Sequence, residues 1–148
     1  MAAVLADTHL LVYAHDSSNP SKQQRAIDIL EHLHSTGAGR LSSQILAEFF
    51  AVATRGKAPL LSVAKAAQQV EDLVSSWITF DVTPLIVIEA VRGVRAHKFS
   101  YWDAQLWATA RLNQVPAVFT EDFNAGATIA GVRFVSPFSP GFNLGEWK

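Results

Sequence analysis

The chain has 148 residues, 49% of them hydrophobic, with a formal net charge of −1 and no cysteine. This length fits one domain, and such a domain buries roughly 70% of its unfolded surface without needing a disulfide or a metal. The absence of cysteine excludes a disulfide framework, a thiolate zinc site and a cysteine nucleophile, while the near-neutral charge counts weakly against a nucleic-acid-binding protein.

Apolar runs bounded by polar or turn residues predict five strands. They lie at 2–6, 40–42, 78–80, 115–120 and 132–135. Apolar residues at helical spacing, with capping residues such as Asn19, Ser62 and Thr83, predict six helices. These run over about 8–15, 22–34, 43–55, 63–76, 84–97 and 100–113.

Strands that alternate with helices predict a parallel sheet with helices on both faces, which is an α/β fold of the three-layer α/β/α type. We assign this domain to residues 1–138 and expect the tail over 139–148 to be irregular. No basic segment precedes the first apolar run, and no apolar stretch reaches the ~20 residues that a membrane span needs. We therefore expect a soluble, cytoplasmic protein.

Four carboxylates are placed where a purely structural role does not explain them well. Asp7 and Asp122 follow apolar strand runs, and sites in parallel sheets form at the carboxyl ends of strands, so these two should meet. Glu48 lies on the apolar stripe of its helix beside Phe49, where an unpaired charge costs several kcal/mol or more. Asp103 also shares a face with apolar residues of its helix.

Each acid also has a simpler interpretation. Asp7 could cap a helix, and Asp103 could form a capping box with Ser100. Glu48 could reach water at the margin of its stripe, and Asp122 could belong to a polar turn. Brought together, however, the four would repel one another unless a cation neutralised them. A site with only oxygen ligands suits Mg²⁺ or Mn²⁺, and phosphodiester hydrolysis is the chemistry that it favours.

Four segments together resemble the motifs of PIN-domain nucleases, especially the VapC toxins of bacterial toxin–antitoxin pairs. Residues 6–14 (ADTHLLVYA) resemble the D-T-N-hydrophobic opening of that family, with His9 where the family usually has Asn. The three later acidic motifs are matched, in order, by residues 46–49 (LAEF), 99–106 (FSYWDAQL) and 119–126 (FTEDFNAG). The match extends from residue 3 to about 138.

The resemblance implies three core metal ligands and one further ligand or second-metal residue: Asp7, Glu48 and Asp103, followed by Asp122. Thr120 would help to place a metal-bound water, and Thr8 would support the site. The resemblance also implies Mg²⁺ as cofactor, with Mn²⁺ as a substitute, and RNA endonuclease activity. It further implies a homodimer and an antitoxin that blocks the site.

The main alternative is a PIN fold that binds RNA or a protein partner without cutting. A receiver-type signalling domain would need paired acids after its first strand, whereas Asp7 stands without an acidic neighbour. A phosphatase with D-x-D at the first strand end would need Asp where His9 stands. Glu121 is adjacent to Asp122, and we prefer Asp122 as the fourth acid because the family's motif places it there.

Overall fold

The computed structural model describes residues 2–121 and 125–147. Within them, six strands form one sheet: β1 (Val4–Ala6), β2 (Gly39–Ser42), β3 (Ile78–Phe80), β4 (Ala117–Phe119), β5 (Thr128–Ile129) and β6 (Val132–Val135). The α-helices of this part of the chain are α1 (Thr8–Tyr13), α2 (Pro20–Thr36), α3 (Ser43–Thr54), α4 (Val63–Ser76), α5 (Pro84–His97) and α6 (Tyr101–Leu112). A 3₁₀ helix, η1 (Leu144–Glu146), follows near the C-terminus.

The sheet has the strand order β3-β2-β1-β4-β6-β5, and every pair of neighbours is parallel except β5 and β6. The chain first builds outward from β1 through β2 to β3 and then places β4 on the other side of β1. β1 and β4 therefore flank the point where the strand order reverses. In sheets of this kind, ligand sites form in the crevice at the carboxyl ends of those two strands.

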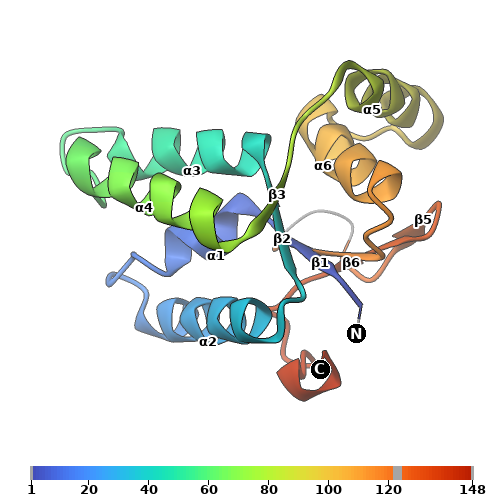
Figure 1. Ribbon diagram of the computed structural model, residues 1–148. Coiled ribbons are helices and arrows are strands. Elements are labelled where there is room, and N and C mark those ends of the chain that lie inside the picture. The colour runs from blue at the N-terminus through green and yellow to red at the C-terminus, as the bar shows by residue number, and fades with distance from the viewer. Residues whose placement is uncertain (1, 122–124, 148) are drawn as a thin grey trace.

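Figure 1 shows helices α1 to α4 on one side of the sheet and α5 and α6 on the other. The predicted three-layer α/β/α class is thus confirmed. Because both faces of the sheet are covered, the central strands are buried along their whole length: Val4, Leu5 and Val118 have no exposed surface. Within the described residues, no helix is long and apolar enough to cross a membrane.

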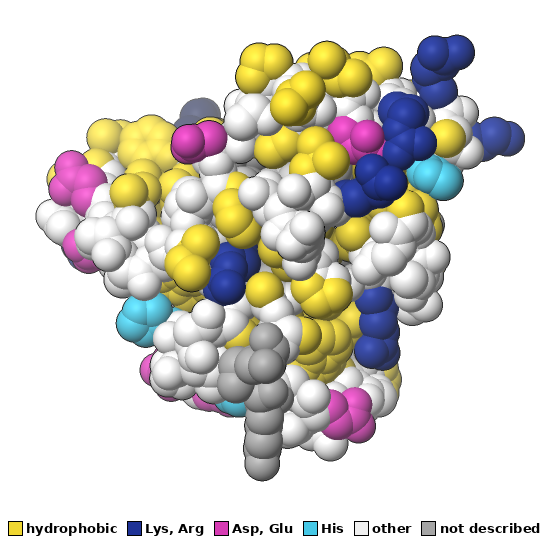
Figure 2. Space-filling view, turned by 45° about the vertical axis from the view of Figure 1, so that its right-hand side comes forward, with side chains coloured by type: hydrophobic (Ala, Val, Ile, Leu, Met, Phe, Trp, Pro, Cys, Tyr) yellow, Lys and Arg dark blue, Asp and Glu magenta, His cyan; other side chains and the backbone are white. Residues whose placement is uncertain are grey.

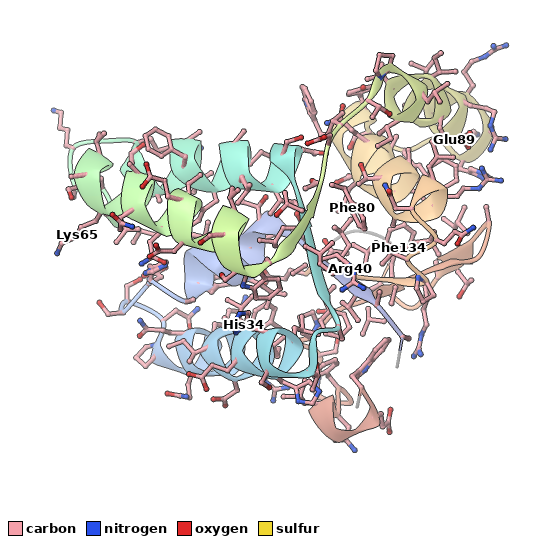
Figure 3. The ribbon with its side chains drawn as sticks, viewed as in Figure 1. His34, Arg40, Lys65, Phe80, Glu89 and Phe134 are labelled. Atoms are coloured by element: carbon pink, nitrogen blue, oxygen red, sulfur yellow. The ribbon has the colours of Figure 1, made fainter. Side chains whose placement is uncertain are left out.

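Capping contacts set the helix ends, and α2 is two residues longer at each end than the predicted 22–34. The Asn19 side chain accepts a hydrogen bond from the backbone N–H of Lys22, with Pro20 as the first helical residue. The helix that Pro20 begins ends at Gly37, whose φ of 72° is a left-handed conformation that glycine adopts without steric cost. Figure 3 shows His34, in the last turn of this helix, pointing toward α4, where its ring stacks on Trp77 at 5.8 Å.

Helices α5 and α6 approach each other closely at Gly93. A Cβ atom built at Gly93 would lie 2.7 Å from Cζ3 of Trp107 and 3.2 Å from Cδ2 of Phe99. Trp107 has no exposed surface, and its indole N–H donates to the Ile129 carbonyl at 3.1 Å. Phe99 also packs edge-on against Phe134 of β6, which Figure 3 shows beneath α6. The absence of a side chain at Gly93 therefore lets α6 pack between α5 and the sheet.

The C-terminal part of the chain departs in two ways from the expected pattern. The sequence analysis did not predict β5, since a two-residue strand is too short to show a periodic pattern. The segment expected to be irregular contains η1, and the rings of Phe142 and Trp147 pack edge-on against Phe119 at 5.4 and 4.9 Å. These apolar residues join the core, while the boundary at residue 138 stays a prediction.

Candidate active site

Asp7 lies at the carboxyl end of β1, in the crevice where the strand order reverses. Its backbone N–H donates to the carbonyl of Phe119, the last residue of β4, at 3.0 Å. One oxygen of its carboxylate accepts from the Thr8 N–H at 2.7 Å, and the other accepts from the Thr120 hydroxyl at 2.8 Å. Asp7 therefore caps α1, as its simpler interpretation held, and also presents a carboxylate at the crevice.

Thr8 joins Asp7 to the second acid of the site, Glu48. The Thr8 hydroxyl donates to Oε2 of Glu48 at 3.3 Å, while the backbone N–H of the same threonine donates to Asp7. The other oxygen of Glu48 accepts from the side-chain amide of Gln44 at 2.8 Å. The structure thus brings the strand end and the inward face of α3 together, as the sequence analysis expected, and both Thr8 and Thr120 are buried.

The ionised form of Asp7 is disfavoured at this site, chiefly by burial. Burial raises the pKa of Asp7 above its ordinary value, and the negative charge of Glu48 raises it further. The hydrogen bonds from Thr120 and Thr8 and the positive charge of His9 act in the opposite direction but do not cancel this rise. A cation at this edge of the sheet would relieve the strain, and oxygen ligands fit a hard divalent cation such as Mg²⁺ or Mn²⁺.

Asp103 does not join this pair in the described part of the chain. The Ser100 hydroxyl donates to Oδ2 of Asp103 at 2.7 Å, and the Asp103 N–H donates back to the Ser100 hydroxyl at 3.4 Å, so Asp103 takes part in capping α6. In residues 2–121 and 125–147, no three Asp, Glu or His side chains lie close enough to hold one metal ion. Asp122 lies outside the described residues. Both ligand roles stay predictions.

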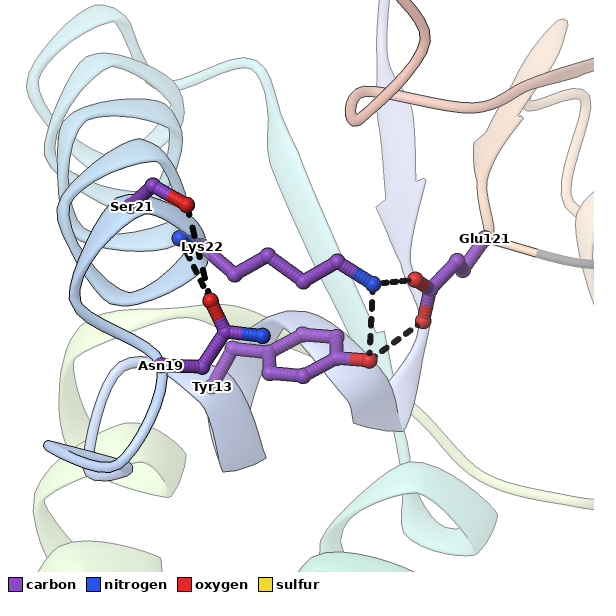
Figure 4. A network of polar contacts seen from close by, with 5 residues as sticks. All are labelled: Tyr13, Asn19, Ser21, Lys22 and Glu121. Carbon is purple, nitrogen blue, oxygen red and sulfur yellow. Dashed lines mark hydrogen bonds and ion pairs between the residues drawn. The ribbon is translucent and has the colours of Figure 1, made fainter.

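Glu121 belongs to a separate polar network, drawn in Figure 4. The Tyr13 hydroxyl donates to one carboxylate oxygen at 2.6 Å, and Lys22 forms an ion pair with the other. The Lys22 ammonium also donates to the Tyr13 hydroxyl at 3.2 Å and lies 5.3 Å from the centre of the Phe138 ring. Lys22 and Tyr13 engage both oxygens of Glu121, so this network accounts for the Glu121 side chain without a role as a metal ligand, and Asp122 as the fourth acid stays a prediction.

Replacing Glu121 with glutamine is expected to lower the free energy of unfolding at pH 7 by about 1 kcal/mol, since it breaks a partly buried ion pair. Burial acts to raise the pKa of Glu121, but the hydrogen bonds from Lys22 and Tyr13 outweigh it and leave the pKa lowered. A lowered folded-state pKa adds stability above the ordinary glutamate value of 4.5, and this stability is lost as the pH falls below it. Urea unfolding at several pH values measures the effect.

The difference in stability between wild type and Glu121→Gln should therefore shrink as the pH is lowered from 5 toward 3. Glu71→Gln, at an exposed position on α4, is the matched control and should show no such trend. A difference that stayed constant or grew at low pH would contradict the assigned network.

The sequence analysis missed Gln44, which holds Glu48 of the site, and it missed Lys22 and Tyr13, which hold Glu121 in the neighbouring network. A signal existed for Gln44, because it stands four residues before Glu48 on one helix, and residues at that spacing contact each other. No such signal existed for Lys22 and Tyr13, which reach Glu121 from about a hundred residues away.

The family of the chain follows from a direct match that covers this site. Residues 4–128 match the family model of the PIN domain. The chain belongs to the PIN-domain family. The match includes the positions of Asp7, Glu48, Asp103 and Asp122, so the resemblance found in the four motifs is confirmed at the level of the family. No curated protein matches the chain at a significant level.

Several solved structures share the fold of this PIN domain. The Mycobacterium tuberculosis toxin VapC20, described as cleaving the Sarcin-Ricin loop, aligns with a TM-score of 0.64 and 17% identity over 86% of this chain and 98% of its own. A toxin–antitoxin complex from Klebsiella pneumoniae aligns with a TM-score of 0.65 and 21% identity, over 92% of this chain and 98% of its own. FitAB bound to a DNA fragment aligns with a TM-score of 0.67 and 19% identity, over 95% of this chain and 99% of its own.

Proposed function

We propose that this PIN domain is a metal-dependent endoribonuclease that hydrolyses phosphodiester bonds of RNA in the cytoplasm, as the toxin of a toxin–antitoxin pair. The observation that carries the proposal is the pair of carboxylates, Asp7 and Glu48, held at the carboxyl ends of the central strands in a member of this family. The description of VapC20, which shares the fold, as a toxin that cleaves the Sarcin-Ricin loop supports the same conclusion.

The residues of the chain have distinct parts in this proposal. Asp7 and Glu48, with Asp103 and Asp122 as further ligands, would hold Mg²⁺ or Mn²⁺. When bound, such an ion activates water, orients the phosphate and stabilises the leaving oxygen. Thr120 fixes one oxygen of Asp7 through its hydroxyl, and it would help to place the attacking water. Thr8 fixes the other oxygen of Asp7 and one oxygen of Glu48, which sets the distance between the two carboxylates.

The test is incubation of the purified protein with mixed cellular RNA in the presence of Mg²⁺ or Mn²⁺. Discrete cleavage that is lost with EDTA and in the Asp7→Asn variant is the expected result. If folded protein leaves every RNA intact in both metals, the alternative of a PIN module that binds RNA or a protein without cutting takes its place.

We propose an antitoxin protein as the partner, because the structure from Klebsiella pneumoniae that shares this fold is described as a toxin–antitoxin complex. A groove of about 380 Å³ between α1, α2 and α4 offers an apolar surface for it. Its lining includes Leu11, Leu30, Phe49, Leu73 and Trp77. A bound antitoxin is expected to suppress the cleavage of RNA by the wild-type protein.

We further propose a homodimer formed through α5. Figure 2 shows hydrophobic side chains gathered over the top of the molecule, where α5 lies, and exposed Leu85, Ile88 and Val91 belong to this helix. An exposed apolar patch of this kind marks an interaction surface. Ile88→Asp is therefore expected to convert a dimer to a monomer, measured as a halved molar mass by light scattering.

The matched control for this prediction is Val63→Asp on α4. Val63 is 64% exposed and Ile88 is 65% exposed, but Val63 lies outside the α5 patch. The control should leave the mass unchanged. A wild-type protein that is already monomeric, or a loss of the dimer in both variants, would count against α5 as the interface.

A further inference from the structure

A chain of hydrogen bonds leads from Glu48 into the interior of the protein through two glutamine side chains. The Tyr101 hydroxyl donates to Oε1 of Gln105 at 2.8 Å, and the amide nitrogen of Gln105 donates to Oε1 of Gln44 at 3.0 Å. The amide nitrogen of Gln44 in turn donates to Glu48 at 2.8 Å. We call Tyr101, Gln105 and Gln44 the amide chain.

The acceptors at the Glu48 end of the amide chain fix the orientation of both glutamine amides. The amide nitrogen of Gln44 contacts two groups that only accept hydrogen bonds, the Glu48 carboxylate and the Trp102 carbonyl at 3.2 Å, and so uses both of its hydrogens. Its oxygen must then face Gln105, which must present its own amide nitrogen. The oxygen of Gln105 is left for Tyr101, which can donate. Neither amide can rotate without leaving two acceptors facing each other.

The burial of Gln105 argues that the amide chain has a function. Gln105 is only 6% exposed, in the middle of a helix whose neighbouring side chains are buried and largely apolar. A buried amide stabilises a protein little unless all its partners are present, whereas an apolar side chain of similar size would pack there without that requirement. The amide chain also joins α3 to α6, because Gln44 binds the Trp102 carbonyl directly before Asp103.

We propose that Gln44 and Gln105 are positioning residues that set the orientation of the Glu48 carboxylate, and its distance from the first turn of α6, for binding a divalent cation. This inference rests on the proposed function, because it assigns to that site two residues outside its set of acids. Gln44 acts on Glu48 directly, and Gln105 acts only through Gln44. Side chains that orient a metal ligand in this way typically change metal affinity by 10- to 100-fold when they are removed.

The test is the affinity of the metal-free protein for Mn²⁺ alone, measured by calorimetry without RNA. Gln44→Leu is expected to weaken binding about tenfold, and Gln105→Leu about threefold. The double variant should bind no more weakly than Gln44→Leu, because Gln105 has no other path to Glu48. Gln24→Leu is the matched control, since Gln24 donates to Asp28 four residues later on an exposed helix face at 2.9 Å, and it should not change the affinity.

Thermal unfolding separates positioning from a merely structural role. Gln105→Leu should leave the melting temperature unchanged or raise it while the Mn²⁺ affinity falls, because leucine suits a buried helix position. If Gln105→Leu does not fold, Tyr101→Phe decides, since it removes only the last donor and should weaken binding about twofold. Unchanged affinity in Gln44→Leu, or losses that multiply in the double variant, would overturn the inference.

The same measurement separates this inference from the proposed function. Wild-type protein that binds no Mn²⁺ would overturn both. Wild-type protein that binds Mn²⁺ and loses it in Asp7→Asn, but not in either glutamine variant, would overturn only the positioning role of the amide chain.

Discussion

Replacing Asp7 with asparagine is expected to abolish RNA cleavage and, in the metal-free protein, to raise the free energy of unfolding. The loss of activity should be at least about a hundredfold, because the variant removes a ligand rather than a residue that supports one. The gain in stability follows from the raised pKa of Asp7, because burial and, to a smaller extent, the charge of Glu48 disfavour its ionised form in the folded protein. Asparagine removes that charge and can still accept the Thr8 N–H.

Cleavage assays in Mg²⁺ and urea unfolding in EDTA at pH 7 measure the two effects. Asp28→Asn, which changes an acid on α2 away from the site, is the control and should alter neither quantity by a comparable amount. An Asp7→Asn protein that was less stable than wild type without metal would mean that Asp7 is chiefly a structural cap. Such a result would weaken the case for an electrostatically strained site built for a cation.

The largest loss of stability is expected from Trp107→Ala. Trp107 is the largest fully buried side chain of α6, and its removal leaves a cavity and deletes the hydrogen bond from its indole N–H to the Ile129 carbonyl. Substitutions of this kind typically lower the free energy of unfolding by about 3–5 kcal/mol. Because α6 also holds Asp103 and Gln105, we expect RNA cleavage to fall as well. Urea unfolding measures the stability change.

Gly93 supplies the internal check on this prediction. Alanine is favoured over glycine by roughly 1 kcal/mol in a helix interior, yet Gly93→Ala should lower stability by about 1–3 kcal/mol, since its Cβ would overlap Trp107. In the presence of Trp107→Ala the same substitution should be harmless or stabilising, because the overlapping ring is gone. Gly141→Ala, where nothing lies within 4 Å of an added Cβ, is the control. Additive losses at 93 and 107 would contradict the packing described.

Local sequence signals predicted most of the fold. The strands at 78–80 and 132–135 and the helix at 84–97 have the boundaries expected from their caps and apolar spacing, because these signals act within a few residues of the chain. The meeting of Asp7 with Glu48 could also be anticipated, since it needs only a strand end and an inward helix face. Because β4 lies beside β1, Thr120 at the end of β4 can donate a hydrogen bond to Asp7 at the end of β1.

What could not be predicted depends on contacts between distant segments. The partners of Glu121 come from α1 and α2, and nothing near Glu121 in the sequence indicates them. The amide chain needs a side chain from α6 to meet one from α3, and the spacing of Gln44 and Glu48 reveals only its last bond. Asp103 shows the reverse case: the capping interpretation considered from the sequence describes its contacts, and its ligand role stays a prediction.

The rings of Phe142 and Trp147 near the C-terminus contact Phe119, which is hydrogen-bonded to Asp7 near the N-terminus. Phe119 accepts the backbone hydrogen bond of Asp7 and directly precedes Thr120, so Phe142 and Trp147 brace from behind the strand that presents this threonine. The last ten residues contribute no acid to the site. They nevertheless support the strand end that presents Thr120, so shortening the chain before Phe142 is expected to loosen the position of Thr120 beside Asp7.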